Sequence, residues 1–260
     1  MEYQELIGSR RSIRYFEPDK PVEPDKIQKI LEACLISSCA VNAHWLKAVV
    51  VKRAEVAPAD LEMMKNPVQA LVISLAPVHI YFYCDLGVVN EVKGARLKEL
   101  VDAGALNPTH GWSHKFVDEL VYPQILKPLT ESPAYPIAAA FDCGVAANQG
   151  LLMAFDLGLG ACLTAFNAEV VAKYTRPPAN WIPLYVLNVG YRAESAQAGG
   201  QRPRPAFEGQ YFLGQYGKPF PRDPRVVEEL KRSKLLQAPA PLPGRKQEVR
   251  ELARRLNLPE

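Results

Sequence analysis

The pattern of hydrophobic and polar positions predicts helices that alternate with a few short strands. Apolar residues at helical spacing follow Pro24, and runs rich in β-branched and aromatic residues have the composition of strands. Strands are expected over residues 47–52, 77–84 and 182–189. Helices are expected over residues 2–8, 24–35, 59–71, 137–159, 168–174, 223–236 and 245–256. Strands interleaved with helices indicate an α/β or α+β domain.

The helix expected over residues 137–159 is nearly uncharged, with only Asp142 and Asp156 interrupting it. A helix that is apolar on all sides is expected to be buried on all sides. One copy of the chain would leave this helix half exposed, so the pattern favours a homodimer.

Composition is that of a soluble globular protein, with 48% hydrophobic and 23% charged residues in 260. The five cysteines form no C-x-x-C pair, and four lie in apolar runs, which indicates buried reduced thiols. No signal peptide is evident and no membrane span is expected, so we predict a cytoplasmic protein.

Charge is close to balanced overall, with 31 Lys and Arg against 28 Asp and Glu, and this predicts no nucleic-acid partner. Residues 218–260 are the basic part, with 11 Lys and Arg against 6 Asp and Glu. We expect a solvated helical extension there. A binding or scaffold protein that uses this basic tail stays open as an alternative.

Several familiar catalytic motifs are missing from the sequence. No G-x-G-x-x-G follows a strand, and no phosphate-binding P-loop or G-x-S-x-G is present. His110 and His114 stand four residues apart without the glutamate of a zinc protease, so no metal is expected.

Two groups of cations lie near opposite ends of the chain. Arg10, Arg11, Ser12 and Arg14 fall within five residues, and Arg202 and Arg204 alternate with prolines. Guanidinium groups bind phosphate through paired hydrogen bonds, and a serine hydroxyl adds a neutral donor. The two groups could converge on one phosphate.

The run SRRSIRYFEPDKPVEPDKIQKILEA resembles the opening of the FMN-dependent nitroreductase family, where R-x-S-x-[RK] precedes an aromatic and a proline-bounded linker. Further segments are similar in order and spacing, so that the resemblance covers roughly residues 5–217. They are SSCAVNAHW, APVHIYFYCD, FDCGVAANQGLLMAFDLGLGACLTAF, and NVGYRAE followed by RPRPAFE.

The resemblance implies an α+β sandwich in which helices flank a central, mostly antiparallel sheet, assembled as an intertwined homodimer. Residues 1–217 would form the FMN-binding domain and 218–260 the basic helical extension. The implied activity is ping-pong electron transfer from NAD(P)H through FMN to a nitroaromatic, a quinone or a similar small-molecule acceptor. A specialised reaction on the same fold and cofactor is the alternative: reductive dehalogenation, flavin cleavage or a biosynthetic oxidation.

The resemblance also implies which residues bind the cofactor's polar end. Arg10 and Ser12 would contact the FMN phosphate or ribityl chain, assisted by Arg11, and the arginines that close on the phosphate would be Arg202 and Arg204. Arg14 would lie near flavin N1 and O2, where a fixed cation stabilises the charge of the reduced flavin.

Other residues would surround the flavin ring. Thr164 and Ala165 match the catalytic pair whose backbone N–H faces flavin N5, and Asn42 would bind the flavin rim or ribityl. Cofactor contacts are also expected from Gln69, Cys39 and His44. Cys39 stands where the family often has Ser, His44 where it often has Gln, and Thr164-Ala165 where it often has Glu-Gly. The variable segment 87–132 would cover the substrate pocket with Trp112, Phe116 and Tyr122.

Overall fold

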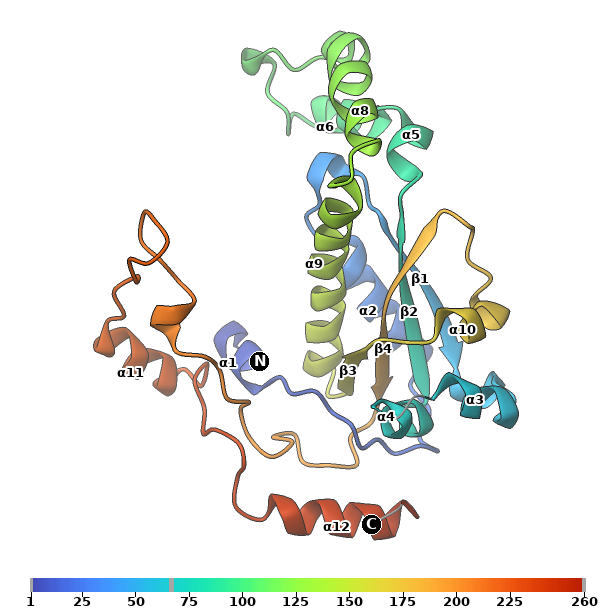
Figure 1. The fold of residues 1–260 in the computed structure, drawn as a ribbon, viewed down its shortest axis with the longest axis vertical. Coiled ribbons are helices and arrows are strands. Elements are labelled where there is room, and N and C mark those ends of the chain that lie inside the picture. The colour runs from blue at the N-terminus through green and yellow to red at the C-terminus, as the bar shows by residue number, and fades with distance from the viewer. Residues whose placement is uncertain (1, 66–67, 259–260) are drawn as a thin grey trace.

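A four-stranded antiparallel sheet forms the centre of the protein (Figure 1), in a computed structural model that describes residues 2–65 and 68–258. The strand order is β1-β2-β4-β3. Val49 pairs with Tyr81, Tyr81 with Val186, and Leu163 with Leu187. The strands are β1 (Leu46–Lys52), β2 (Val78–Asp85), β3 (Gly160–Thr164) and β4 (Trp181–Gly190).

Helices cover both faces of this sheet (Figure 1). On one face α2 (Pro24–Leu35) and α9 (Tyr135–Asp156) bury a cluster that includes Ile30, Phe82 and Leu151. On the other face Tyr81 and Tyr83 pack among residues from α3 (Pro58–Met64), α4 (Ala70–Leu75) and α10 (Ala168–Thr175). Because consecutive strand residues point to opposite faces, β2 serves both clusters. The predicted α+β sandwich is confirmed.

The three predicted strands are confirmed, but the sequence pattern missed β3. Its five residues follow α9 after only three others, so the run looks like an extension of the apolar helix. Gly158, with φ +78°, ends the helix. Gly160 lets the N-terminal segment approach, since a Cβ there would lie 2.7 Å from Ile13 Cγ2. Ile13 N donates to Ala161 O over 3.1 Å, which attaches that segment to β3.

Among the helices, the single one expected over 59–71 is wrong, because α3 and α4 are separate; Asn66 and Pro67 lie outside the described residues. A π-helix spans Val117–Leu126 and contains Pro123. The shorter α-helices are α1 (Tyr3–Ser9), α5 (Val88–Val92), α6 (Ala95–Asp102), α7 (His114–Phe116) and α8 (Lys127–Thr130).

A single chain leaves part of the long apolar helix exposed, as the sequence pattern predicts. In α9, Cys143 and Leu151 are buried, whereas Ile137 and Phe141 are 74% and 73% exposed. By length and composition alone α9 could cross a membrane, although none was expected; it packs instead against α2 and the sheet. Its exposed side is an apolar surface without a cover from the described residues of the same chain.

The C-terminal segment, with α11 (Pro224–Arg232) and α12 (Arg245–Arg255), docks along the N-terminal one. The fully buried carboxylate of Glu194 forms an ion pair of 2.5 Å with Arg245, and it also accepts from the backbone N–H of Arg14 and Tyr15. Arg255 adds an ion pair of 3.0 Å with Glu17. One carboxylate therefore ties α12 to the last residue of the first arginine group and to the residue after it.

A buried polar chain crosses the sheet from β2 to β3. Asn188 donates through Nδ2 to Cys162 O (3.1 Å) and Thr164 Oγ1 (2.9 Å), so its Oδ1 accepts from His79 Nδ1 (2.8 Å). His79 therefore carries its proton on Nδ1, and its buried Nε2 has no partner among the described residues. Burial, with a smaller contribution from Arg53, lowers the pKa of His79 to about 4.

This shift predicts acid destabilisation of the fold. Between pH 6.5 and 4 the imidazole of His79 is protonated in the unfolded chain but stays neutral in the folded chain. The free energy of unfolding therefore decreases by about 3 kcal/mol as the pH is lowered through this range. Chemical denaturation at a series of pH values measures it. His79→Gln should flatten this part of the profile, whereas His110→Gln, at an exposed position that ends a short 3-10 helix, should not. Identical profiles for wild type and His79→Gln would contradict the assignment.

Candidate functional site

The two arginine groups meet at one cavity of about 880 Å³. Its walls come from the N-terminal segment, from Asn148 and Leu152 of α9, from the loop after Gly200, and from the C-terminal segment. The expected cation and hydroxyl residues all line it: Arg10, Arg11, Ser12, Arg14, Arg202 and Arg204. Residues from opposite ends of the chain therefore form one strongly positive site.

Electrostatics at this cavity are unbalanced. Six arginines line it, and no Asp or Glu is among its lining residues, which all belong to the described part of the chain. Arg11 is only 6% exposed, and its buried Nε has no hydrogen-bond partner. Burial lowers the pKa of Arg10, with Arg204 adding to it; burial also lowers the pKa of Arg11, aided by Arg10, Arg202 and Arg204. A bound anion would relieve this repulsion.

Cys162 and Thr164 lie on one face of β3, next to the first arginine group. Ser12 and Cys162 share a hydrogen bond, and the charges of Arg14 and Arg10 partly offset the burial that raises the pKa of Cys162. Thr164 stands two residues further along the strand, so it lies on the same face as Cys162. Its Oγ1 accepts from Asn188, which leaves the hydroxyl proton able to donate.

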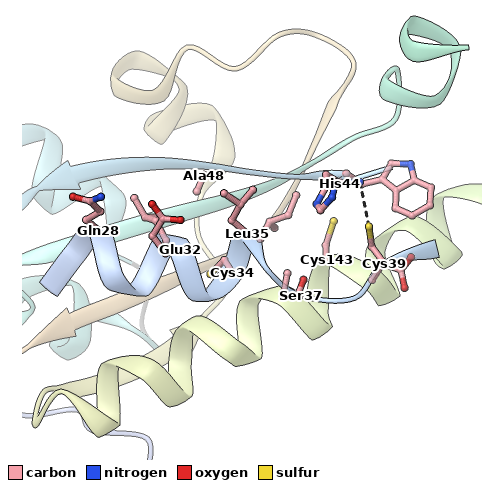
Figure 2. A pocket seen from close by; sticks show the side chains of 14 residues that line it. Gln28, Glu32, Cys34, Leu35, Ser37, Cys39, His44, Ala48 and Cys143 are labelled. Atoms are coloured by element: carbon pink, nitrogen blue, oxygen red, sulfur yellow. Dashed lines mark hydrogen bonds between the residues drawn. The ribbon is translucent and has the colours of Figure 1, made fainter. Parts of the chain in front are cut away.

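Two of the three flavin-contact candidates of the loop before β1 lie at a second cavity, of about 360 Å³ (Figure 2), and the third, Asn42, is not among its lining residues. Cys39 and His44 line it with residues of α2, β1 and α9. The loop is braced internally, since His44 Nε2 lies 2.8 Å from Asn42 Oδ1 and His44 N donates to Cys39 Sγ over 3.3 Å. Val41, Asn42 and His44 have φ of 51°, 54° and 55°, a left-handed conformation that costs energy outside glycine.

The two cavities share no lining residue, so one chain does not bring Cys39 and His44 to the arginines. Gln69, just before α4, lines neither cavity. The three aromatic residues expected at the substrate pocket pack against a hydrophobic cluster that includes Trp45 and Cys84, with 5.4 Å between the ring centroids of the first two; they are Trp112, Phe116 and Tyr122. Their role at a substrate pocket stays a prediction.

Sequence reasoning missed the part of the arginine cavity contributed by the C-terminal segment. Arg222, Leu235 and Leu236 line it, and Gln201 does so from the loop before Arg202. A signal was present for Arg222, because Pro221 lies directly before it, just as Pro203 lies directly before Arg204. No pattern in the sequence around Leu235, Leu236 or Gln201 indicates that these residues line the cavity.

Comparison with known proteins agrees with this architecture. Residues 7–100 match the model of the nitroreductase family. A protein from Methanothermobacter thermautotrophicus named "Putative NADH dehydrogenase/NAD(P)H nitroreductase" is 26% identical over 200 residues, which cover 75% of this chain and 80% of that protein.

Solved structures share the fold. A nitroreductase-like protein from Streptococcus mutans, 17% identical, superposes with a TM-score of 0.64 over 82% of this chain and 98% of its own. A "putative nitroreductase in complex with FMN" from Exiguobacterium sibiricum, 16% identical, gives a TM-score of 0.58 over 75% of this chain and 90% of its own. The family match over residues 7–100, which begins just before the first arginine group, and the common fold make this chain similar to proteins of the nitroreductase family.

Proposed function

We propose that the protein is an FMN-dependent oxidoreductase that transfers electrons from NAD(P)H to a small-molecule acceptor such as a nitroaromatic or a quinone. The observation that carries this proposal is the arginine cavity, where six guanidinium groups meet without a carboxylate among the lining residues. The fold shared with a protein solved in complex with FMN supports the choice of cofactor.

The residues present fit the phosphate end of FMN. The buried Arg11 Nε without a partner is the kind of donor that an anion satisfies, and charge-assisted hydrogen bonds are the strongest class. Arg10 and Ser12 would hold the phosphate from the N-terminal side, and Arg202 and Arg204 from the other. A cavity of about 880 Å³ lies in the size range of cofactor sites, roughly 300–1,000 Å³.

Arg14, Thr164 and Ala165 would contact the flavin ring of the cofactor. When bound, FMN supplies the hydride and electron chemistry of the reaction. Arg14, whose Nη1 donates to Ser12 O over 3.0 Å, would place a fixed positive charge at the N1 and O2 edge. Thr164 and Ala165, at the end of β3, would face N5, and the hydroxyl of Thr164 is oriented by Asn188.

The cofactor would bind between two copies of the chain. Cys39, Asn42 and His44 belong to a loop that does not reach the arginine cavity of its own chain, so they can contact the same FMN only from a second copy. The exposed Phe141 of α9 and Ile36 after α2 offer the apolar surface that a homodimer would cover. Residues 1–217 would form the main part of this FMN-binding unit, in the cytoplasm, and Arg222, Leu235 and Leu236 of the C-terminal segment would complete its wall.

Removing two arginines from opposite ends of the chain should release the cofactor. Arg10→Ala with Arg204→Ala deletes charge-assisted contacts from both walls, and we expect FMN affinity to fall by about 100-fold. Absorbance near 450 nm and fluorescence titration measure it. Arg96→Ala with Arg225→Ala is the matched control, because these exposed arginines pair locally with Glu99 and Asp223. FMN content equal to that of the control would overturn the site.

Turnover tests the reaction itself. The FMN-loaded protein should oxidise NADH or NADPH with menadione or nitrofurazone as acceptor, and double-reciprocal plots at several acceptor concentrations should be parallel lines, as ping-pong kinetics requires. Flavin-loaded protein without turnover towards either acceptor would instead favour a specialised reaction on the same cofactor. Protein that stays colourless after FMN addition would contradict the flavin itself.

A further inference from the structure

We propose that Gln237 and Gln201 form a brace that fixes the two arginine groups at the spacing the flavin phosphate requires, which makes Gln237 a positioning residue of the site. This inference rests on the proposed function, because it concerns how the phosphate is held. Gln237 belongs to the C-terminal segment, well outside the residues that match the family.

The contacts of Gln237 join three parts of the chain. Its Oε1 accepts from Arg11 Nη2 over 2.9 Å, and its Nε2 donates to Ser9 Oγ over 2.8 Å. Its backbone N donates to Gln201 Oε1 over 2.9 Å. One side chain therefore holds the guanidinium of the first arginine group, while its backbone is held by the residue directly before Arg202.

Gln201 completes the brace from its own side. Its Nε2 donates to Leu235 O over 2.9 Å, and its backbone pairs with the same segment through Gln201 N to Ala238 O (3.0 Å) and Ala240 N to Gln201 O (2.8 Å). Four hydrogen bonds thus fix residues 235–240 to the start of the second arginine group. The distance between the two groups is set through this segment before any ligand binds.

Close packing leaves the segment little freedom against α1. Gly8 is buried, and a Cβ placed there would lie only 2.0 Å from Lys234 O and 2.6 Å from Leu235 Cα. Lys234 also forms an ion pair of 2.7 Å with Glu5. The wall that carries Gln237 is therefore pressed against the helix that directly precedes Arg10.

The choice of an amide has a chemical consequence. A carboxylate at position 237 would neutralise the charge of Arg11. Glu194 does this to Arg245, which also belongs to the C-terminal segment. The neutral amide orients Arg11 and accepts one of its hydrogen bonds while leaving the whole positive charge for a ligand. The brace therefore lowers the cost of ordering the arginines without reducing their attraction for a dianion.

Comparison of FMN with riboflavin, which lacks the phosphate, separates this role from a general effect on folding. For Gln237→Glu, which gives Arg11 an internal counter-charge, we expect FMN affinity to fall by about tenfold or more and riboflavin affinity to stay within about twofold. Gln237→Met, which removes the acceptor, should also lower the FMN-to-riboflavin affinity ratio, by a smaller factor. Titration of the full-length apoprotein with each flavin measures both affinities.

Gln247→Glu is the matched control, because it makes the same charge change at an exposed position of α12 in the same segment. It should leave the ratio unchanged. Gly8→Ala, which displaces the segment without altering any arginine, should lower the ratio in the same direction as Gln237→Met. Melting curves of every variant identify any that fails to fold, and the folded variants decide the outcome.

The outcomes distinguish the two proposals. Wild-type protein that binds FMN no more tightly than riboflavin would overturn the placement of the phosphate, and with it the proposed function. Wild-type protein that prefers FMN, together with Gln237→Glu and Gln237→Met variants that keep the wild-type ratio, would overturn the brace alone. Equal losses for both flavins in these variants would also overturn it, because they indicate a structural role.

Discussion

Positive charge that the chain does not neutralise is the feature on which the arrangement of the site depends. Folding gathers six guanidinium groups around one cavity whose lining includes no Asp or Glu. Burial of Arg11 with an unsatisfied Nε costs free energy, and mutual repulsion adds to that cost, as the lowered pKa values of Arg10 and Arg11 indicate. Such an unfavourable arrangement is typical of a binding site, because a ligand offsets its free-energy cost. A phosphate dianion offsets it through charge-assisted hydrogen bonds, which are the strongest class.

The fold maintains this arrangement by tying both ends of the chain to β3. Gly160 allows Ile13 to lie against the strand, Glu194 fixes the backbone of Arg14 and Tyr15, and Arg245 attaches α12 to that same carboxylate. The C-terminal segment, which looks like a solvated basic tail in the sequence, therefore belongs to the wall of the site. Along β3 the buried chain from His79 through Asn188 orients Thr164, so that one strand connects the charged end of the cavity to the expected ring position.

Periodicity was enough to predict an α/β or α+β domain, because long apolar runs such as residues 77–84 and 137–159 signal their own burial, and the family resemblance narrowed this to an α+β sandwich. It missed β3, whose five residues merge with the preceding helix, and it joined α3 to α4. The meeting of Arg10 with Arg204 could be predicted because proline-stiffened cations are visible in sequence. The role of Gln237 could not be predicted, because it depends on a hydrogen bond with Arg11, which lies 226 positions away in the sequence. Cys39 and His44 were expected at the flavin, but one chain places them at a different cavity, and periodicity carries no information about a second copy.

The ionisation of the bound phosphate tests the central claim most directly. Phosphorus NMR of FMN in the protein, recorded from pH 8 to pH 5, follows the second ionisation of its phosphate, whose pKa in water is about 6. Surrounding guanidinium groups favour the dianion, so the account predicts a pKa well below 6 and a resonance that stays at its dianion position down to pH 5. A bound phosphate that titrates as it does in free FMN would contradict the account, because its charge would then be in contact with solvent and not with the arginines.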